Sequence, residues 1–302
     1  MVDGLPPDVP ALTTALAEQE YLADEGLATS LFLALRLQRP LLLEGEAGVG
    51  KTEAAKAISR LTGGELIRLQ CYEGIDVAQA VYEWDHARQL LHLRAAEAAG
   101  QDMAEVEDGL YDERFLVRRP LLRAIGHTGD GAPPVLLIDE VDRADDEFEA
   151  FLLEILSDWA VTVPELGTVT ATVPPVVVIT SNRTRDVHDA LKRRCLYHWV
   201  EHPTFEREVA IVELKVPDAT GTLAAQAAGA VEGLRELRLY KPPGVAETID
   251  WVRALATLGR SELDDASVEA TLGSVVKYRE DAERVRSFGV EHLVEAARAR
   301  AG

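Results

Sequence analysis

The sequence predicts an α/β fold in which a mostly parallel sheet lies between helices, followed by a smaller helical region. Almost wholly apolar runs at 41–43, 135–138 and 176–180 have the composition of strands that are buried on both faces. A glycine-rich turn joins the first run to a stretch with helical spacing. Apolar strand runs stop after His202, and the rest of the chain is charged and alanine-rich, which is typical of helices.

The composition describes a globular chain with an unusual charge. The chain has 302 residues, 47% of them hydrophobic, and a formal net charge of −21. So acidic a chain repels polyphosphate at long range, which disfavours nucleic acid as a partner unless a local basic face exists. Cys71 and Cys195 are too few for a disulfide framework, and the opening MVDGLPPDVP shows no secretory signal. No apolar run reaches the ~20 residues of a membrane span, so we expect a cytoplasmic protein without one.

The turn after the first apolar run, GEAGVGKT, fits the pattern GxxxxGK[ST]. Its glycines let successive backbone N–H groups point at a phosphate, and the following helix adds its positive N-terminal end. A chance match is roughly a 1% event in a chain of ordinary composition. The turn therefore predicts a site for ATP, in which Lys51 reaches the β and γ phosphates and the Thr52 hydroxyl ligates Mg²⁺. Its residues are Gly45, Glu46, Ala47, Gly48, Val49, Gly50, Lys51 and Thr52.

Two carboxylates follow the second apolar run, at Asp139 and Glu140. Open α/β sheets place ligands at the carboxyl ends of their strands. Asp139 is therefore positioned to hold the Mg²⁺ shell, and Glu140 to polarise an attacking water, which suits hydrolysis. The alternative is a solvated acidic turn at a strand end, which the phosphate-binding turn upstream makes the weaker interpretation.

The segment after the acidic pair predicts a helix, a hairpin and a third strand. Asp146 is expected to cap the helix, with Glu149 closing a capping box. The alternating runs AVTV and TVTATV are parted by PELG, which predicts a β-hairpin. The third strand ends at Ser181 and Asn182. An amide at that position can orient the water or sense the terminal phosphate, although a strand-ending Ser-Asn pair is also an ordinary turn.

This order of parts resembles the AAA+ ATPases, with their Walker A loop, Walker B strand, hairpin, asparagine strand and arginine-bearing segment. The resemblance implies a P-loop NTPase with an αβα sandwich, a parallel sheet, a β-hairpin insert and a small C-terminal helical lid. The hairpin resembles the insert that marks the helix-two-insert and MoxR branch. The stretches RLQCYEGID, AVYEWDHARQLL, RPLLRAI, IDEVDRADDEFEAFLLEILSD and LKRRCLYHW are similar to CoxD-like MoxR ATPases. The likeness covers most of the chain.

The resemblance carries roles to particular residues. Asp139 and Glu140 match the metal-binding and catalytic carboxylates, and Asn182 matches the first sensor. Arg194, with Arg193 as second choice, occupies the place of an arginine finger, which stabilises charge on the nucleotide of a neighbouring subunit. Without the family context, the two arginines are ordinary solvated surface charges.

The resemblance also leaves two features open. The family's second sensor is an arginine at the start of a lid helix, where KPPGVAETIDW places Ala246 or Glu247, with Lys241 a few residues upstream. Tyr82 and Trp84 lie where ring-forming relatives carry inserts toward the central pore. These two aromatic residues either grip a client or pack beneath an acidic loop.

The sequence predicts a nucleotide-binding α/β domain over residues 1–203 and a helical lid domain over residues 204–302. Thr204 can cap the first lid helix. His198 and His202 have a spacing that binds metals on helices, but they are expected on a strand and the loop after it, where they do not converge.

The resemblance implies Mg²⁺-dependent ATP hydrolysis by a homo-oligomeric, hexameric ring that remodels a protein client. MoxR-type proteins are associated with metalloenzyme maturation beside a partner with a von Willebrand factor A domain. The CoxD-like stretches point to a molybdenum hydroxylase such as carbon monoxide dehydrogenase. Two alternatives use the same scaffold: a nucleic-acid-dependent motor or loader, whose stimulation by DNA would be salt-sensitive, and an ATP-gated scaffold with little turnover.

Overall fold

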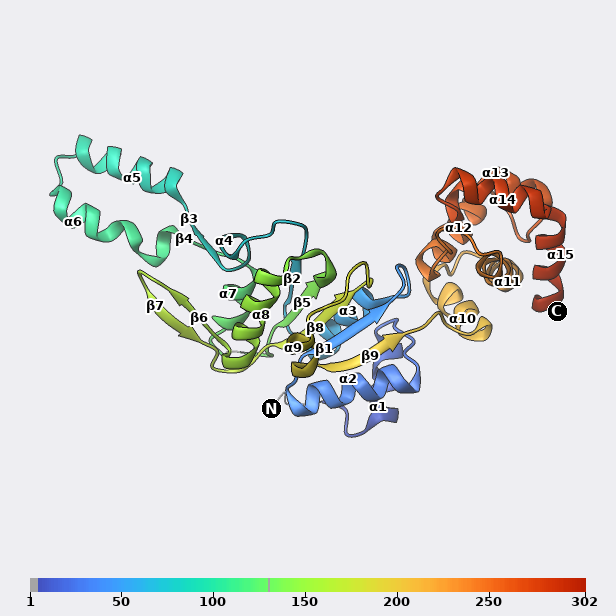
Figure 1. Ribbon diagram of the computed structural model, residues 1–302, viewed down its shortest axis with the longest axis horizontal. Helices are drawn as coiled ribbons and strands as arrows, with labels where there is room; N and C mark the ends of the chain where they lie inside the picture. Colours follow the sequence, from blue (N-terminus) through green and yellow to red (C-terminus); the bar gives the residue numbers. More distant parts are fainter. Residues whose placement is uncertain (1–4, 130) are drawn as a thin grey trace. The chain divides into compact units, whose positions relative to one another are not determined.

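The computed structural model describes residues 5–129 and 131–302 of the chain (Figure 1). Their contacts form two compact units. The first comprises residues up to Ala15, Glu25–Glu44 and Ala55–His198, and the second comprises Leu16–Asp24, Gly45–Ala54 and Trp199–Gly302. The segment Gly45–Ala54, which includes the whole phosphate loop, therefore belongs with the C-terminal helices. The domain boundary between residues 203 and 204 stays a prediction.

A five-stranded sheet in the order β2-β5-β8-β1-β9 is the centre of the first unit. The pairs β2–β5, β5–β8 and β8–β1 are parallel, which confirms the predicted α/β class. The apolar runs of the sequence are β1, β5 and β8, and almost every residue in them is buried. The strands are β1 (Leu41–Gly45), β2 (Leu66–Gln70), β5 (Val135–Asp139), β8 (Val176–Ser181) and β9 (Leu196–Val200).

The helices α1 (Val9–Glu18), α2 (Glu25–Leu37), α3 (Lys51–Thr62), α7 (Pro120–Ile125), α8 (Asp146–Asp158) and α9 (Asp189–Arg194) accompany this sheet. The cap of α8 was predicted one residue too late. Asp145 has the extended backbone of an N-cap, and its carboxylate accepts the Phe148 N–H at 2.8 Å. Glu149 closes no capping box, because it is buried and accepts from the Arg185 guanidinium and the His188 N–H.

The predicted hairpin is confirmed as β6 (Ala160–Val163) paired antiparallel with β7 (Gly167–Thr170). A second insertion follows the short helix α4 (Val77–Ala80), in the region where the resemblance implied one, but its strands and helices were not predicted. The antiparallel strands β3 (Tyr82–Trp84) and β4 (Leu116–Arg118) form its base. From them α5 (His86–Ala98) and α6 (Met103–Asp108) extend away from the sheet (Figure 1), followed by the short helices η1 (Gly109–Tyr111) and η2 (Glu113–Phe115).

The aromatic residues Tyr82 and Trp84, at the base of this arm, pack against other aromatic side chains. Trp84 is only 8% exposed and belongs to the main core. Its ring meets Tyr111 edge-on, with 5.3 Å between ring centroids, and Tyr82 edge-on at 6.4 Å. Trp84 is therefore a core residue, and Tyr82 is half-buried.

The C-terminal part of the second unit is helical, as predicted. Its helices are α10 (Phe205–Lys215), α11 (Gly221–Glu236), α12 (Val245–Thr257), α13 (Asp265–Val275), α14 (Arg279–Phe288) and α15 (Val290–Ala301). Trp251 is completely buried in their core, and its indole N–H donates to the Thr271 hydroxyl at 2.7 Å. None of the helices in the part of the chain that the structure describes combines the length and apolar character of a membrane span.

Candidate functional site

The phosphate loop runs from the end of β1 into the first turn of α3. Gly48 and Gly50 have φ angles of +80° and +97°, a region that glycine adopts without the strain of a side chain. Lys51 is 6% exposed, and its ammonium donates to the carbonyls of Gly45 at 2.8 Å and Glu46 at 2.6 Å. A buried cation is thus held by the carbonyls of the loop's own backbone.

The N-terminal segment Leu16–Asp24 packs beside this loop within the second unit. The Tyr21 hydroxyl donates to the Gly50 carbonyl at 3.4 Å, and burial raises the pKa of its phenol. Arg207 of α10 donates to the Leu22 carbonyl at 2.8 Å and to the Asp24 carboxylate at 2.8 Å. Helix α10 is therefore tied to a segment that flanks the loop, a connection that sequence reasoning missed.

The start of α12 contacts the phosphate loop more directly. A Cβ on Gly244 would lie 2.7 Å from the Ala47 carbonyl oxygen, so only glycine fits there without a shift. The Ala246 N–H donates to the Gly48 carbonyl at 3.2 Å. Glu247 accepts the Gly244 N–H at 3.0 Å, and a Cβ on Gly48 would lie 2.7 Å from that same carboxylate. An acidic side chain thus stands beside the loop at the start of the lid helix.

Lys241, the other candidate for a second sensor, is anchored elsewhere. Its side chain is exposed, and its backbone N–H donates to the buried Asp281 carboxylate at 3.1 Å. The structure therefore places Ala246 and Glu247 at the loop. In the described part of the chain, Lys241 makes no hydrogen bond or ion pair with the phosphate loop.

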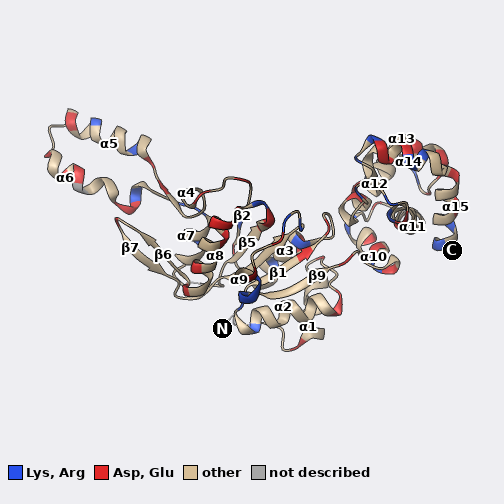
Figure 2. Ribbon diagram, in the orientation of Figure 1, with Lys and Arg blue, Asp and Glu red and all other residues tan. Residues whose placement is uncertain are grey.

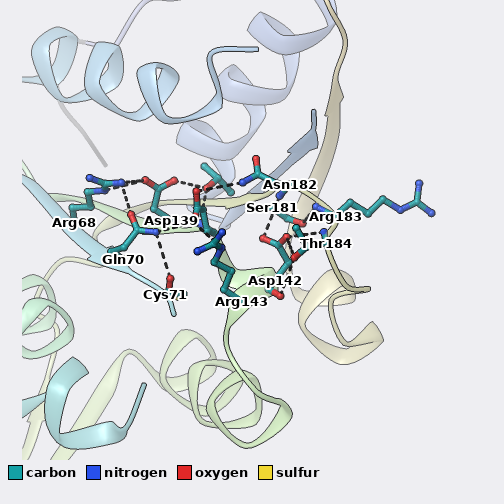
Figure 3. Close-up of polar contacts among 12 residues, drawn as sticks. Arg68, Gln70, Cys71, Asp139, Asp142, Arg143, Ser181, Asn182, Arg183 and Thr184 are labelled. Carbon is teal, nitrogen blue, oxygen red and sulfur yellow. Dashed lines mark hydrogen bonds and ion pairs between the residues drawn. The ribbon is translucent and has the colours of Figure 1, made fainter. Parts of the chain in front are cut away.

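In the first unit, Asp139 ends β5 as a buried carboxylate that is 2% exposed. Its Oδ1 accepts the Thr180 hydroxyl at 2.5 Å, and its Oδ2 accepts Nε and Nη2 of Arg68 at 2.9 and 2.5 Å (Figure 3). The arginine balances a charge that would otherwise be costly to bury. Oxygen ligands of this kind suit Mg²⁺, so the donor set at Asp139 fits that ion.

Glu140 follows with a left-handed backbone, φ +56°, which is uncommon for any residue but glycine. Its side chain accepts the Gln70 amide at 3.2 Å and the Asn182 amide at 3.4 Å. The Arg143 guanidinium lies 3.1 Å from it. The backbone N–H of Glu140 is fixed separately by the Thr180 hydroxyl at 2.9 Å. The structure thus brings Asp139, Glu140 and Asn182 together.

A second buried carboxylate, Asp142, fixes the loop that carries Asn182. It is 3% exposed, and it accepts the Asn182 backbone N–H at 3.2 Å. It also accepts the Thr184 N–H and hydroxyl at 2.8 and 2.7 Å. Arg183, between them, points away from the cluster (Figure 3). The position of the Asn182 amide therefore depends on a carboxylate that sequence reasoning missed.

Arg193 and Arg194 are exposed in the last turn of α9. Their assignment as fingers stays a prediction.

Sequence reasoning also missed Arg68 and Gln70, although a signal was present. Gln70 is the last residue of β2 and Arg68 lies two residues before it, and residues two apart on a strand share one face. The register sets Gln70 opposite Asp139. A polar pair on alternate positions of a strand next to the acidic strand would have predicted contact with its carboxylates.

His198 and His202 contact different partners. The imidazole of His198 lies 3.4 Å from the Ser30 hydroxyl, and that of His202 lies 3.1 Å from the Glu46 carboxylate. Within residues 5–129 and 131–302 there is no group of three or more histidine, cysteine, aspartate or glutamate side chains that could hold a metal.

A parallel sheet with a phosphate loop after β1, and with Asp139 and Glu140 at the end of β5, is the scaffold of a P-loop NTPase. Residues 40–195, just over half of the chain, match the family model described as AAA domain (dynein-related subfamily). The chain belongs to this family.

A curated relative and several solved structures are similar to parts of the chain. Midasin of Giardia intestinalis is 47% identical over 45 residues, which are 15% of this chain and 1% of midasin. The RuvB Holliday junction branch migration motor of Thermotoga maritima has a TM-score of 0.47 and 15% identity, over 86% of this chain and 68% of that one. A variant of that protein has a TM-score of 0.48 and 16% identity, over 82% and 67%. The family assignment rests on the family model and the sheet, not on these scores.

Proposed function

We propose that this protein is a Mg²⁺-dependent ATPase of the MoxR branch, similar to CoxD-like ATPases, that uses hydrolysis to remodel a protein client in the cytoplasm. The observation that carries the ATPase assignment is the cluster of Asp139, Glu140 and Asn182 at the carboxyl edge of the sheet. The neighbouring strand β1 leads into the loop GEAGVGKT at that same edge.

Each group of residues has its own role in the proposed hydrolysis of ATP. The loop from Gly45 to Thr52 holds the triphosphate through its N–H groups, with Lys51 at the β and γ phosphates. Thr52 and Asp139 would hold the Mg²⁺, which when bound would neutralise charge on the phosphate oxygens. Water attacks the γ-phosphorus and gives its proton to Glu140, while the bond to the β–γ bridging oxygen breaks and ADP leaves. Asn182 orients that water or senses the phosphate.

The contacts of Glu140 describe a resting arrangement. Gln70, Arg143 and Asn182 all hold its carboxylate. To accept a proton from water, Glu140 must exchange one of these contacts for the water. Arg194, or Arg193, then supplies positive charge in trans from the next subunit of a hexameric ring.

The client is proposed to be a metalloenzyme, with a von Willebrand factor A domain protein as adaptor. The CoxD-like stretches of the sequence support a molybdenum hydroxylase such as carbon monoxide dehydrogenase. The arm at 82–118 offers a surface for protein contact, since Leu90 and Leu91 on it are 52% and 69% exposed. A nucleic-acid motor is the second candidate. It would use the same scaffold, and a net charge of −21 opposes it.

The ATPase assignment is tested by comparing Glu140→Gln with Glu147→Gln, a matched change at an exposed glutamate of α8. We expect Glu140→Gln to bind ATP normally and to release phosphate at least about a hundredfold more slowly, while Glu147→Gln matches the wild type. Normal turnover by Glu140→Gln would remove the proposed base.

The client is tested by capture. Tagged Glu140→Gln, which should keep ATP and its partners, is recovered from its native cells and the bound proteins are identified. A von Willebrand factor A protein together with a molybdenum enzyme would support the maturation role. Nuclease-sensitive DNA with replication proteins would favour the motor, and an ATPase rate that DNA does not raise at low salt would exclude it.

A further inference from the structure

The C-terminal end of α9 is held by an arginine from a distant part of the sequence. Arg39 lies between α2 and β1, and its Nη2 reaches three successive backbone carbonyls. These are the carbonyls of Arg193 at 3.2 Å, Arg194 at 3.0 Å and Cys195 at 3.4 Å. A backbone bond continues the attachment one residue further on each side, since the Leu196 N–H donates to the Pro40 carbonyl at 2.8 Å.

Elementary electrostatics explains why a cation belongs there. The last carbonyls of a helix have no partner within the helix and carry its negative end. α9 has six residues, and the side chains in its last turn are all basic (Figure 2). The last four carbonyls of a helix have no partner within it, which in a helix of six residues is most of them, so α9 needs an outside partner to hold its final turn in one conformation. Arg39 is that partner.

The basic residues of that turn are not equivalent. Lys192 is turned inward, with its ammonium 3.6 Å from the buried Glu44 carboxylate. Arg193 and Arg194 are exposed. The direction in which these two guanidinium groups leave the surface is set by the backbone to which Arg39 is bound.

We propose that Arg39 is a positioning residue for the trans-acting arginine. It holds the last turn of α9 so that Arg194, or Arg193, points toward the nucleotide of the neighbouring subunit. The inference rests on the proposed function, because it requires an arginine that acts in trans. Arg39 touches neither nucleotide nor metal in this proposal. It acts through the backbone carbonyls of residues 193–195, which we call the finger segment.

The chain offers a matched control one turn earlier. Arg36, also on the surface, donates to the Pro6 carbonyl at 2.9 Å and lies over the Phe32 ring at 5.3 Å. It has the same chemistry, but it lies within α2 and its partners are not in α9. Arg36→Gln therefore removes a comparable surface arginine without releasing the finger segment.

The test uses mixed rings. Arg194→Ala subunits keep intact sites and lack the finger, while Glu140→Gln subunits keep the finger and lack hydrolysis. Mixing the two should restore ATP hydrolysis, because each Glu140→Gln subunit serves the site of an Arg194→Ala neighbour. We expect Glu140→Gln with Arg39→Gln to restore at least fivefold less activity, and Glu140→Gln with Arg36→Gln to restore as much as Glu140→Gln alone. Arg39→Lys, which keeps a cation for the carbonyls, should retain most of the rescue.

The outcomes distinguish the positioning role of Arg39 from the trans action of Arg194 or Arg193. Full rescue by the Arg39→Gln double variant would overturn the positioning role while leaving the trans arginine in place. Absence of rescue by Glu140→Gln alone, repeated with Arg193→Ala as the acceptor, would overturn the trans arginine and the inference with it. Arg39→Gln must also bind ATP and assemble like the wild type. If it fails to do so, its role is general stability and the inference is wrong.

Discussion

Asp142 provides the sharpest prediction about the site, since it holds Asn182 without touching the proposed reaction. In Asp142→Asn the side chain keeps its shape and one oxygen. That oxygen should face Thr184, which makes the two shorter bonds at 2.8 and 2.7 Å. The new NH₂ group then meets the Asn182 N–H, which loses the acceptor it had at 3.2 Å.

The expected loss in the free energy of unfolding follows from these contacts. A hydrogen bond to a charged group contributes about 1.5–3 kcal/mol, and a buried N–H without a partner costs about 1–3 kcal/mol. Because the two terms describe the same lost bond, we expect a loss of about 2–4 kcal/mol in the free energy of unfolding of the first unit. At roughly 2–4 °C per kcal/mol for a unit of this size, the melting temperature should fall by about 4–16 °C.

The assay pairs thermal unfolding with steady-state phosphate release. Asp142→Asn should lower turnover by about tenfold or more, equivalent to about 1.4 kcal/mol of transition-state stabilisation, with ATP affinity unchanged. Asp186→Asn is the control in the same loop. Its carboxylate is 82% exposed and lies 3.8 Å from Arg183, so its effect should stay within about 0.5 kcal/mol. Wild-type melting and turnover in Asp142→Asn would refute the claim that this carboxylate positions Asn182.

Glu247→Gln removes a negative charge beside the phosphate loop and should tighten ATP binding by roughly threefold to tenfold in a fluorescence titration; unchanged affinity would show that the carboxylate does not sense the phosphates. Arg235→Met leaves the buried Glu208 carboxylate without the guanidinium that contacts it at 2.6 and 2.9 Å, so the helical unit should lose about 3–5 kcal/mol on unfolding, with Glu208→Gln restoring part of it. Burial raises the pKa of the Cys71 and Cys195 thiols from 9.0 to about 12. The stability that they contribute is therefore complete below pH 9 and is lost as the pH rises toward 12, and Cys→Ala variants should show a shallower alkaline fall in urea unfolding.

Much of the fold followed from the sequence because its strongest signals are local. The apolar runs of β1, β5 and β8, the glycine turn and the hairpin around PELG each depend on residues within a few positions of one another. The arm at 82–118 escaped prediction because its base is a pair of three-residue strands, too short for alternation to show. The helix cap was misplaced by one residue because 145 and 146 are both aspartate, and only backbone geometry separates them.

The residues of the candidate site were also predicted only where the signal is local. The phosphate loop, the acidic pair and Asn182 were found from motifs. Arg68, Gln70 and Asp142 were missed because their importance lies in contacts with residues about 40 to 70 positions away. The contact of Gly244 with Ala47 likewise joins distant segments. Such partners become visible only when strand order and lid packing are known.

The most direct test of the account is a single-turnover measurement with limiting radiolabelled ATP and excess protein, quenched in acid over time. The account predicts that the wild type converts its bound ATP to ADP and phosphate in the presence of Mg²⁺. It predicts that Glu140→Gln retains intact ATP over the same period, with equal nucleotide bound. Conversion at the wild-type rate by Glu140→Gln would contradict the assignment of Glu140 as the base and, with it, the mechanism derived from this site.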